Sequence, residues 1–136
     1  MAFGTATVLT NVGKGIVAKR LIGTTPAQIT PNFQAIGTGA TGAARTAVAA
    51  DTALSTEVET RVSTNAGTTV TTTQTNDTFQ VIQTTTCTAD RSVDEAGLFD
   101  QTAVGGNMFI SATFSVVSLK LAGPDALQLT WKYQST

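Results

Sequence analysis

The chain has 136 residues, enough for one domain with a single core. Charged residues make up only 12% of it and the formal net charge is −1, so there is no electrostatic basis for binding nucleic acid. No run approaches the roughly 20 apolar residues that cross a membrane. The absence of histidine excludes Ser-His-Asp and Cys-His catalysis. We therefore expect no enzyme, no cofactor and no nucleic-acid or membrane partner.

Residues 1–30 read as an N-terminal arm or a short helix, ahead of a sandwich domain at residues 31–136. The segment LTNVGKGIVAKRLIG offers Thr10 or Asn11 as a helix cap and Gly23 as a stop. Two internal glycines each cost about 1 kcal/mol relative to alanine in a helix, so an extended arm outside the core remains the alternative. A third possibility is a helix folded back over one open end of the sandwich.

Residues 35–44, AIGTGATGAA, place Gly37, Gly39 and Gly42 in the spacing G-x-G-x-x-G, and Glu57 follows at about the distance of a dinucleotide-binding unit. That unit needs a helix opening at the last glycine and a parallel strand after it. The next segment is short, without a regular apolar face, and the later strands read as antiparallel. We expect a surface loop that binds no nucleotide.

Residues 57–61, EVETR, alternate as a strand does. Glu57 or Glu59 is predicted to form an exposed cross-strand pair with Arg61, which would contribute under about 1 kcal/mol.

Threonine makes up about a fifth of the chain, and β-branched side chains favour strands. Between Ser63 and Thr78 the only sizeable aliphatic residue is Val70, so a strand there has little core of its own to fix its register. The segment is either a solvated hairpin arm or, as we favour, a strand held by a neighbouring subunit. The solitary Cys87 is predicted to be a small core residue.

Four carboxylates cluster in ADRSVDEAGLFD, at Asp90, Asp94, Glu95 and Asp100. Carboxylates are Ca²⁺ ligands and can act in catalysis, but their spacing here is not that of a calcium loop. Arg91 in the same stretch favours a surface ion-pair patch instead.

The C-terminal part reads as a β-meander. In NMFISATFSVV the apolar residues from Met108 to Val116 alternate with polar ones, and Phe109 falls on the polar face. ALQLTWKYQ alternates strictly, which puts Trp131 and Tyr133 in the core. The predicted buried residues are Phe79, Leu98, Met108, Ile110, Phe114, Leu127, Leu129 and Trp131. The fold class is an all-β antiparallel sandwich, jelly-roll-like, with a short N-terminal helix or arm.

The run EAGLFDQTAVGGNMFISATFS followed by LQLTWKY, together with the upstream AIGTGATGAARTAVAADTALSTEVETR, resembles a pattern of small β-sandwich virion proteins of tailed bacteriophages. The resemblance spans about residues 33–133. It implies structural roles, with Leu98 and Phe99 anchoring a strand, Gly97 allowing a bend and Glu95 pairing with Arg61.

The same resemblance implies a capsid cement (decoration) protein that binds the major capsid protein on the outer surface of the virion as a homotrimer, after synthesis in the host bacterial cytoplasm. Tail fibre, collar and baseplate proteins share the pattern and are the alternative. A glycan-binding sandwich is a third class, for which Trp131 and Tyr133 are the available aromatic rings.

The predicted contact residues for the capsid or a neighbour lie in the first 23 residues. This segment holds three of the eight basic residues, so the remainder of the chain is acidic. A basic, apolar segment suits docking onto an acidic surface. The contact set is Lys14, Lys19, Arg20, Leu21 and Ile22.

Overall fold

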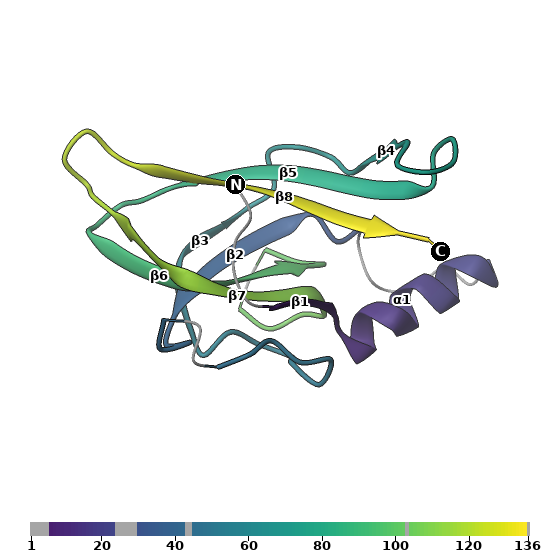
Figure 1. Ribbon diagram of the computed structural model, residues 1–136, viewed down its shortest axis with the longest axis horizontal. Helices are drawn as coiled ribbons and strands as arrows, with labels where there is room; N and C mark the ends of the chain where they lie inside the picture. Colours follow the sequence, from purple (N-terminus) through teal and green to yellow (C-terminus); the bar gives the residue numbers. More distant parts are fainter. Residues whose placement is uncertain (1–5, 24–29, 43–44, 103, 136) are drawn as a thin grey trace.

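The computed structural model describes residues 6–23, 30–42, 45–102 and 104–135. In this part of the chain, two antiparallel sheets face each other and one helix lies at one end of them (Figure 1). The predicted all-β sandwich with a short N-terminal helix is therefore confirmed.

The larger sheet has five described strands in the order β1-β7-β6-β2-β3. Their bounds are β1 Ala6–Leu9, β7 Met108–Leu119, β6 Arg91–Phe99, β2 Phe33–Thr38 and β3 Thr56–Val62. The smaller sheet has the order β4-β5-β8, with bounds β4 Thr68–Val70, β5 Thr78–Thr86 and β8 Ala126–Gln134.

The C-terminal strands do not form the predicted meander. β6 and β7 pair with each other, but β7 and the next strand, β8, belong to different sheets. The turn between them is closed by the Asp125 backbone N–H, which donates to the Lys120 carbonyl at 2.9 Å, and by the Lys120 N–H, which donates to the Asp125 carboxylate at 2.8 Å. This turn carries the chain from one sheet to the other, so β8 faces β7 across the sandwich instead of pairing with it.

A β-bulge in β7 changes which side chains enter the core. Leu98 pairs with Ile110 while Phe99 pairs with Met108, so Phe109 is an extra residue in β7. Phe109 and Ile110 both belong to the inter-sheet core, whereas Met108 packs in a second cluster with Phe99. The predicted alternation was therefore wrong at Met108 and Phe109 and right from Ile110 to Phe114. It was wrong again at Val116, which is exposed, because the β6–β7 register shifts a second time and Val117 packs against the core instead.

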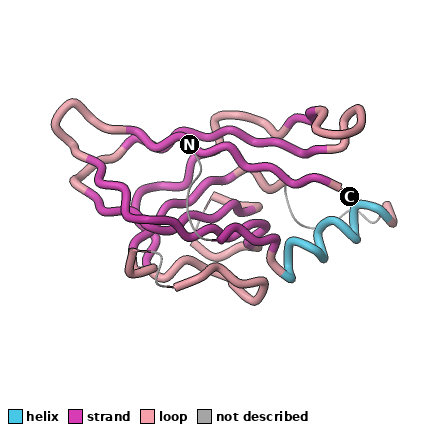
Figure 2. Tube along the Cα trace, viewed as in Figure 1, coloured by secondary structure: helices cyan, strands magenta, loops and turns pink. Residues whose placement is uncertain are grey.

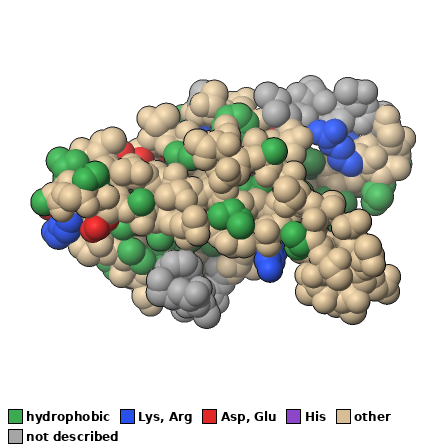
Figure 3. Space-filling view, turned by 90° about the horizontal axis from the view of Figure 1, so that it is seen from above, with side chains coloured by type: hydrophobic (Ala, Val, Ile, Leu, Met, Phe, Trp, Pro, Cys, Tyr) green, Lys and Arg blue, Asp and Glu red, His purple; other side chains and the backbone are tan. Residues whose placement is uncertain are grey.

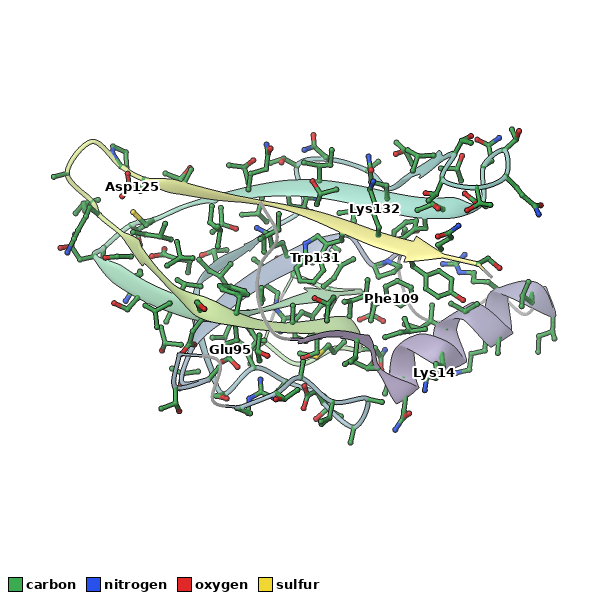
Figure 4. The ribbon with its side chains drawn as sticks, viewed as in Figure 1. Lys14, Glu95, Phe109, Asp125, Trp131 and Lys132 are labelled. Carbon is green, nitrogen blue, oxygen red and sulfur yellow. The ribbon has the colours of Figure 1, made fainter. Side chains whose placement is uncertain are left out.

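The core prediction is otherwise confirmed. Seven of its eight residues are buried and Phe79 is half-buried against the same cluster. Cys87 is a buried core residue, as expected. Figure 4 shows Trp131 and Phe109 between the two sheets.

The N-terminal segment is part of the sandwich, which corrects the prediction of an arm outside the core. β1 pairs with β7, and the helix α1, Asn11–Leu21, buries Ile16 in the inter-sheet core. Thr10 is the predicted N-cap: its hydroxyl accepts from the Gly13 N–H at 2.9 Å. Gly23 follows the helix with φ of +71°. The alternative of a helix folded over one end of the sandwich is the one observed.

Loops cover the outer face of the five-stranded sheet (pink below the strands in Figure 2). Residues 45–54 lie there: the Ala47 N–H donates to the Thr113 hydroxyl at 3.2 Å, and the Ser111 hydroxyl donates to Asp51 at 2.7 Å. Leu54 packs on Phe99. Both faces of its central strands β6 and β2 are therefore buried.

Candidate binding surface

The predicted contact residues all lie on α1 or directly after it, and all are exposed. Leu21 is 82% and Ile22 75% exposed, so they stand among the most exposed large apolar side chains described. Lys14, labelled in Figure 4, projects from the outer side of the helix. The structure thus places all five residues in solvent-exposed positions on α1 or directly after it, and two of them, Arg20 and Leu21, line the same hollow.

An apolar hollow lies beside these residues, between α1 and the end of the sandwich. Its volume is about 310 Å³. The described residues that line it are Ile16, Val17, Arg20, Leu21, Thr30, Pro31, Phe79, Phe109 and Tyr133. A concave apolar site next to protruding apolar side chains is a typical arrangement of a binding surface.

The aromatic floor of the hollow depends on the bulge in β7. Phe109 contacts Phe79 and Tyr133 edge-to-face, with ring centroids 5.9 and 6.0 Å apart. The bulge carbonyls are satisfied by Thr10, whose N–H donates to Phe109 O at 3.0 Å and whose hydroxyl donates to Met108 O. A Cβ on Gly13 would clash with the same Phe109 carbonyl, so glycine is needed where α1 docks.

Sequence reasoning missed Phe79, Phe109 and Tyr133 as parts of this surface. The available signal was Phe109, a large aromatic residue on the face of its strand that otherwise carried only serine and threonine.

The glycine-rich segment, residues 37–42, binds the side chain of Asp94 from the same chain. The N–H groups of Ala40 and Gly42 donate to the two oxygens of Asp94 at 3.1 and 2.9 Å. Gly37 lies within β2, where a Cβ would come within 2.8 Å of both Glu95 Oε1 and Thr56 O. The predicted surface loop is therefore wrong for residues 35–38, which belong to β2. The glycines serve close packing and a tight turn, and the absence of nucleotide binding stays a prediction.

The four clustered carboxylates do not form the predicted surface ion-pair patch. Asp94, Glu95 and Asp100 are buried, and only Asp90 is exposed, 3.3 Å from Lys120. Asp100 accepts from the Asn107 N–H at 2.8 Å and from its side-chain amide at 2.7 Å. Asp94 and Glu95 lie within β6 and Asp90 and Asp100 lie just beyond its two ends, so the four carboxylates meet different partners.

Glu95 is fully buried, and the prediction that it pairs with Arg61 is wrong. Its carboxylate accepts from Arg45 at 2.8 Å and from the Thr56 N–H at 3.1 Å. Arg45 also binds Asp51 at 3.2 Å. Burial raises the pKa of Asp51, but hydrogen bonds from Ser111, the Val48 N–H and Arg45 outweigh it and hold that pKa below its ordinary value.

Arg61 does pair with Glu57, at 2.7 Å, but the pair lies within one strand and is not exposed. The Arg61 guanidinium stacks 3.7 Å from the centre of the Phe99 ring and donates to the carbonyls of Gln101 and Gly105. Arg61 thereby connects the second apolar cluster, which contains Phe99, to the turn between β6 and β7. Glu59 instead pairs with Arg91, at 2.9 Å.

The threonine-rich segment forms the three-residue strand β4 and a loop built around Asp77. The N–H groups of Gln74, Thr72 and Thr73 donate to its carboxylate at 3.0, 2.9 and 2.9 Å. These bonds hold the pKa of Asp77 far below its ordinary range. The segment is organised by its own carboxylate, and the neighbouring subunit stays a prediction.

Trp131 is buried, and its indole N–H donates to Gln34 Oε1 at 3.0 Å, while the Gln34 amide donates to Thr85 at 2.9 Å. Tyr133 is half-buried. Neither ring forms an open stacking platform on the outer face for a sugar.

Among the described residues there is no group of three or more His, Cys, Asp or Glu side chains placed to hold a metal ion. The one described helix is too short and too polar to span a membrane. Searches of protein-family models, curated proteins and solved structures found no match for this chain.

Proposed function

We propose that this chain is a non-enzymatic structural protein of a tailed-phage virion, and specifically a capsid cement protein that binds the exterior of the shell as a homotrimer. The observation that carries the proposal is the end of the sandwich capped by α1. There, Leu21 and Ile22 are exposed beside an apolar hollow that Arg20 and Leu21 help to line, and the helix also carries Lys14 and Lys19.

The buried carboxylates of the sandwich support a binding role for this protein rather than a catalytic one. The buried carboxylates Asp94, Glu95 and Asp100 each meet donors from the protein itself. Such groups hold strands and loops in place, whereas a catalytic carboxylate needs access to a substrate. The motif EAGLFD of the phage resemblance covers the end of β6 and the following Asp100, all buried, which agrees with structural roles for its residues.

Docking through α1 would supply a modest contact per subunit. In a trimer, the second and third contacts form at high effective concentration, so the assembly binds more tightly than one chain. The surface carries cations and no acidic residue on the helix, which suits an acidic capsid surface.

Binding to undecorated capsids tests this proposal. Deleting the first 23 residues is unsuitable, because β1 and Ile16 belong to the fold. We expect the double variant Leu21→Ser, Ile22→Ser to lose at least tenfold in affinity while its melting temperature is kept. A matched control is Val104→Ser, Val116→Ser, which removes exposed apolar side chains away from α1. Equal binding by all three proteins would contradict docking through α1.

The tail location is separated from the capsid location by the number of copies in each virion. Hundreds of copies indicate the capsid, whereas a handful indicate a fibre, collar or baseplate. Quantitative mass spectrometry of purified virions gives this number directly, and it does not depend on which surface of the chain makes the contact.

A further inference from the structure

Three of the four described sheet edges are protected against pairing with another chain. β1 has four residues and β4 has three. The third edge, β3, is interrupted by a register shift, has Glu59 at φ of +62° and carries three charged side chains. Short length, bulges and charge are the devices by which natural sheets avoid edge-to-edge association.

β8 is the fourth edge and has none of these devices. It is nine residues long and pairs with β5 in an unbroken register from Ala126 to Gln134. It contains no proline, and its one charge is Lys132. The other exposed side chains of β8 are uncharged, at Ala126, Gln128 and Thr130. This is consistent with the mostly tan surface seen from above in Figure 3. Such an edge is a template for a further strand.

The hydrogen-bond pattern shows which β8 backbone groups face this open edge. The Ser135 N–H donates to Asp77 O and the Cys87 N–H donates to Asp125 O, both at 3.0 Å. These bonds continue the β5–β8 register, and in an antiparallel pair bonded residues alternate. Odd-numbered β8 residues therefore bond to β5, and the N–H and C=O groups of Gln128, Thr130 and Lys132 point away from it.

Within the described part of the chain, the inner side of the same edge is apolar and incompletely covered. A gap of about 90 Å³ lies between β8 and the β1–β7 edge of the other sheet. The described residues that line it are Thr7, Ile110, Ala112, Phe114, Leu129, Thr130, Trp131 and Lys132. A strand added to β8 would bring its own inward side chains against this gap.

We propose that β8 pairs antiparallel with β8 of a second copy of this chain, across a two-fold axis at Thr130. The two three-stranded sheets then form one six-stranded sheet. Thr130 lies opposite the partner's Thr130, and Gln128 opposite the partner's Lys132. Leu129 lies opposite the partner's Trp131, which extends the apolar inner face.

The strand itself selects this partner and this centre. Thr130 is the middle residue of β8, so an axis there pairs all nine residues, and any other centre leaves some of them without a partner. An axis at Lys132 would also place two cations opposite each other, which is unfavourable. With the axis at Thr130, no like charges are opposed.

This contact goes beyond the proposed function and does not rest on it. A two-fold contact closes after two copies, so it is separate from any three-fold contact of a cement trimer. It predicts assemblies with an even number of chains: two chains if it acts alone, or six if trimers also form.

Two cysteine variants on the same face of β8 test the contact and its register. In Thr130→Cys the two cysteines oppose each other with Cα atoms about 5.5 Å apart, within disulfide range. In the matched control Gln128→Cys, the cysteines are offset by four residues, about 13 Å. Under mild oxidation we expect at least tenfold more disulfide-linked dimer from Thr130→Cys. The native Cys87 is buried, so the wild-type chain is expected to form none.

The mass in solution gives a second readout. Thr130→Pro removes an N–H that faces away from β5, so the fold is expected to persist while the mass measured by light scattering falls by half. A wild-type monomer or trimer, equal crosslinking by the two cysteine variants, or an unchanged mass for Thr130→Pro would each overturn the inference. Loss of capsid binding with intact crosslinking would instead count against the proposed function alone.

Discussion

The two sheets of this molecule are stabilised in different ways. β6, in the five-stranded sheet, is buried at seven consecutive residues from Val93 to Phe99, because loops cover the outer face of its sheet. β8, in the three-stranded sheet, alternates between exposed and buried residues because only its inner face is covered. The difference shows that the number of covered faces, and not the strand itself, sets the pattern of side chains.

Covering both faces has a consequence for polar groups. The outer layer of the five-stranded sheet is tied by Arg45 and Asp51 of the covering loop, which bind Glu95 of β6 and Ser111 of β7. The outer face of the three-stranded sheet instead carries threonine and glutamine in contact with water. Substitutions of similar chemistry should therefore cost more on the first sheet than on the second.

The largest effect is expected where both sheets meet. Phe114→Ala removes a fully buried ring from the shared core and should lower the free energy of unfolding by about 3–5 kcal/mol. The matched control is Val116→Ala on the same strand, where the side chain is half exposed, with an expected loss below about 0.5 kcal/mol. Urea unfolding measures both. Equal losses would show that the inward face of β7 is misassigned.

Acid should weaken the carboxylate-tied regions next. Asp51, Glu59 and Asp77 all have pKa values below their ordinary ones in the folded chain. Their contribution is complete at a pH well above the ordinary pKa, near 4, and is lost progressively as the pH falls from this value through the lower pKa of the folded chain. The melting temperature should therefore drop below about pH 4.

The chain has no histidine, so the same melts should be nearly flat between about pH 5.5 and 7. Asp77→Asn should show a shallower fall in acid than the wild type, because one of the titrating carboxylates is gone. A wild-type melting temperature that stays constant down to pH 2 would contradict these roles.

Glu95→Gln should cost about 2 kcal/mol, as expected for a hydrogen-bonded charge whose partner, Arg45, can partly turn to water. The control is Asp90→Asn, which breaks the exposed pair with Lys120 and should change stability little. Chemical denaturation compares the two variants. A larger loss for Asp90→Asn would reverse the assignment of the structural ion pair.

The smallest effects come from removing one chemical group, a hydroxyl, from each of the two sheets. Ser111→Ala removes a buried hydroxyl that donates to Asp51, with an expected loss of about 1–2 kcal/mol. Thr84→Ala removes a hydroxyl that accepts from exposed Gln128, with an expected loss below about 0.5 kcal/mol. Thermal melts of the pair at pH 7 decide whether the covered face is the more sensitive one.

Local patterns in the sequence were enough to predict the helix cap at Thr10 and the alternating strand from Leu127 to Trp131. Both depend on residues a few positions apart. The bulge at Phe109 was missed because it arises from pairing with β6 and from the docking of Gly13 beneath it. Neither contact leaves a mark on the periodicity of β7 beyond one misplaced aromatic residue.

The candidate surface was predicted in part for a similar reason. Leu21 and Ile22 are exposed at the end of the helix, as a basic, apolar segment suggested. The hollow beside them combines residues from α1, β5, β7 and β8, which only the fold brings together. The partner of Glu95 was likewise out of reach, since Arg45 lies 50 positions away in a loop.

Residue-resolved amide hydrogen exchange tests the contrast between the two sheets most directly. In the Thr130→Pro variant, where the open edge cannot pair, the outward N–H groups of Gln128 and Lys132 should exchange far faster than those of Leu129 and Trp131. The amides of β6 from Val93 to Phe99 should exchange only through global unfolding. Equal protection of β6 and of the outward amides of β8 would contradict the account.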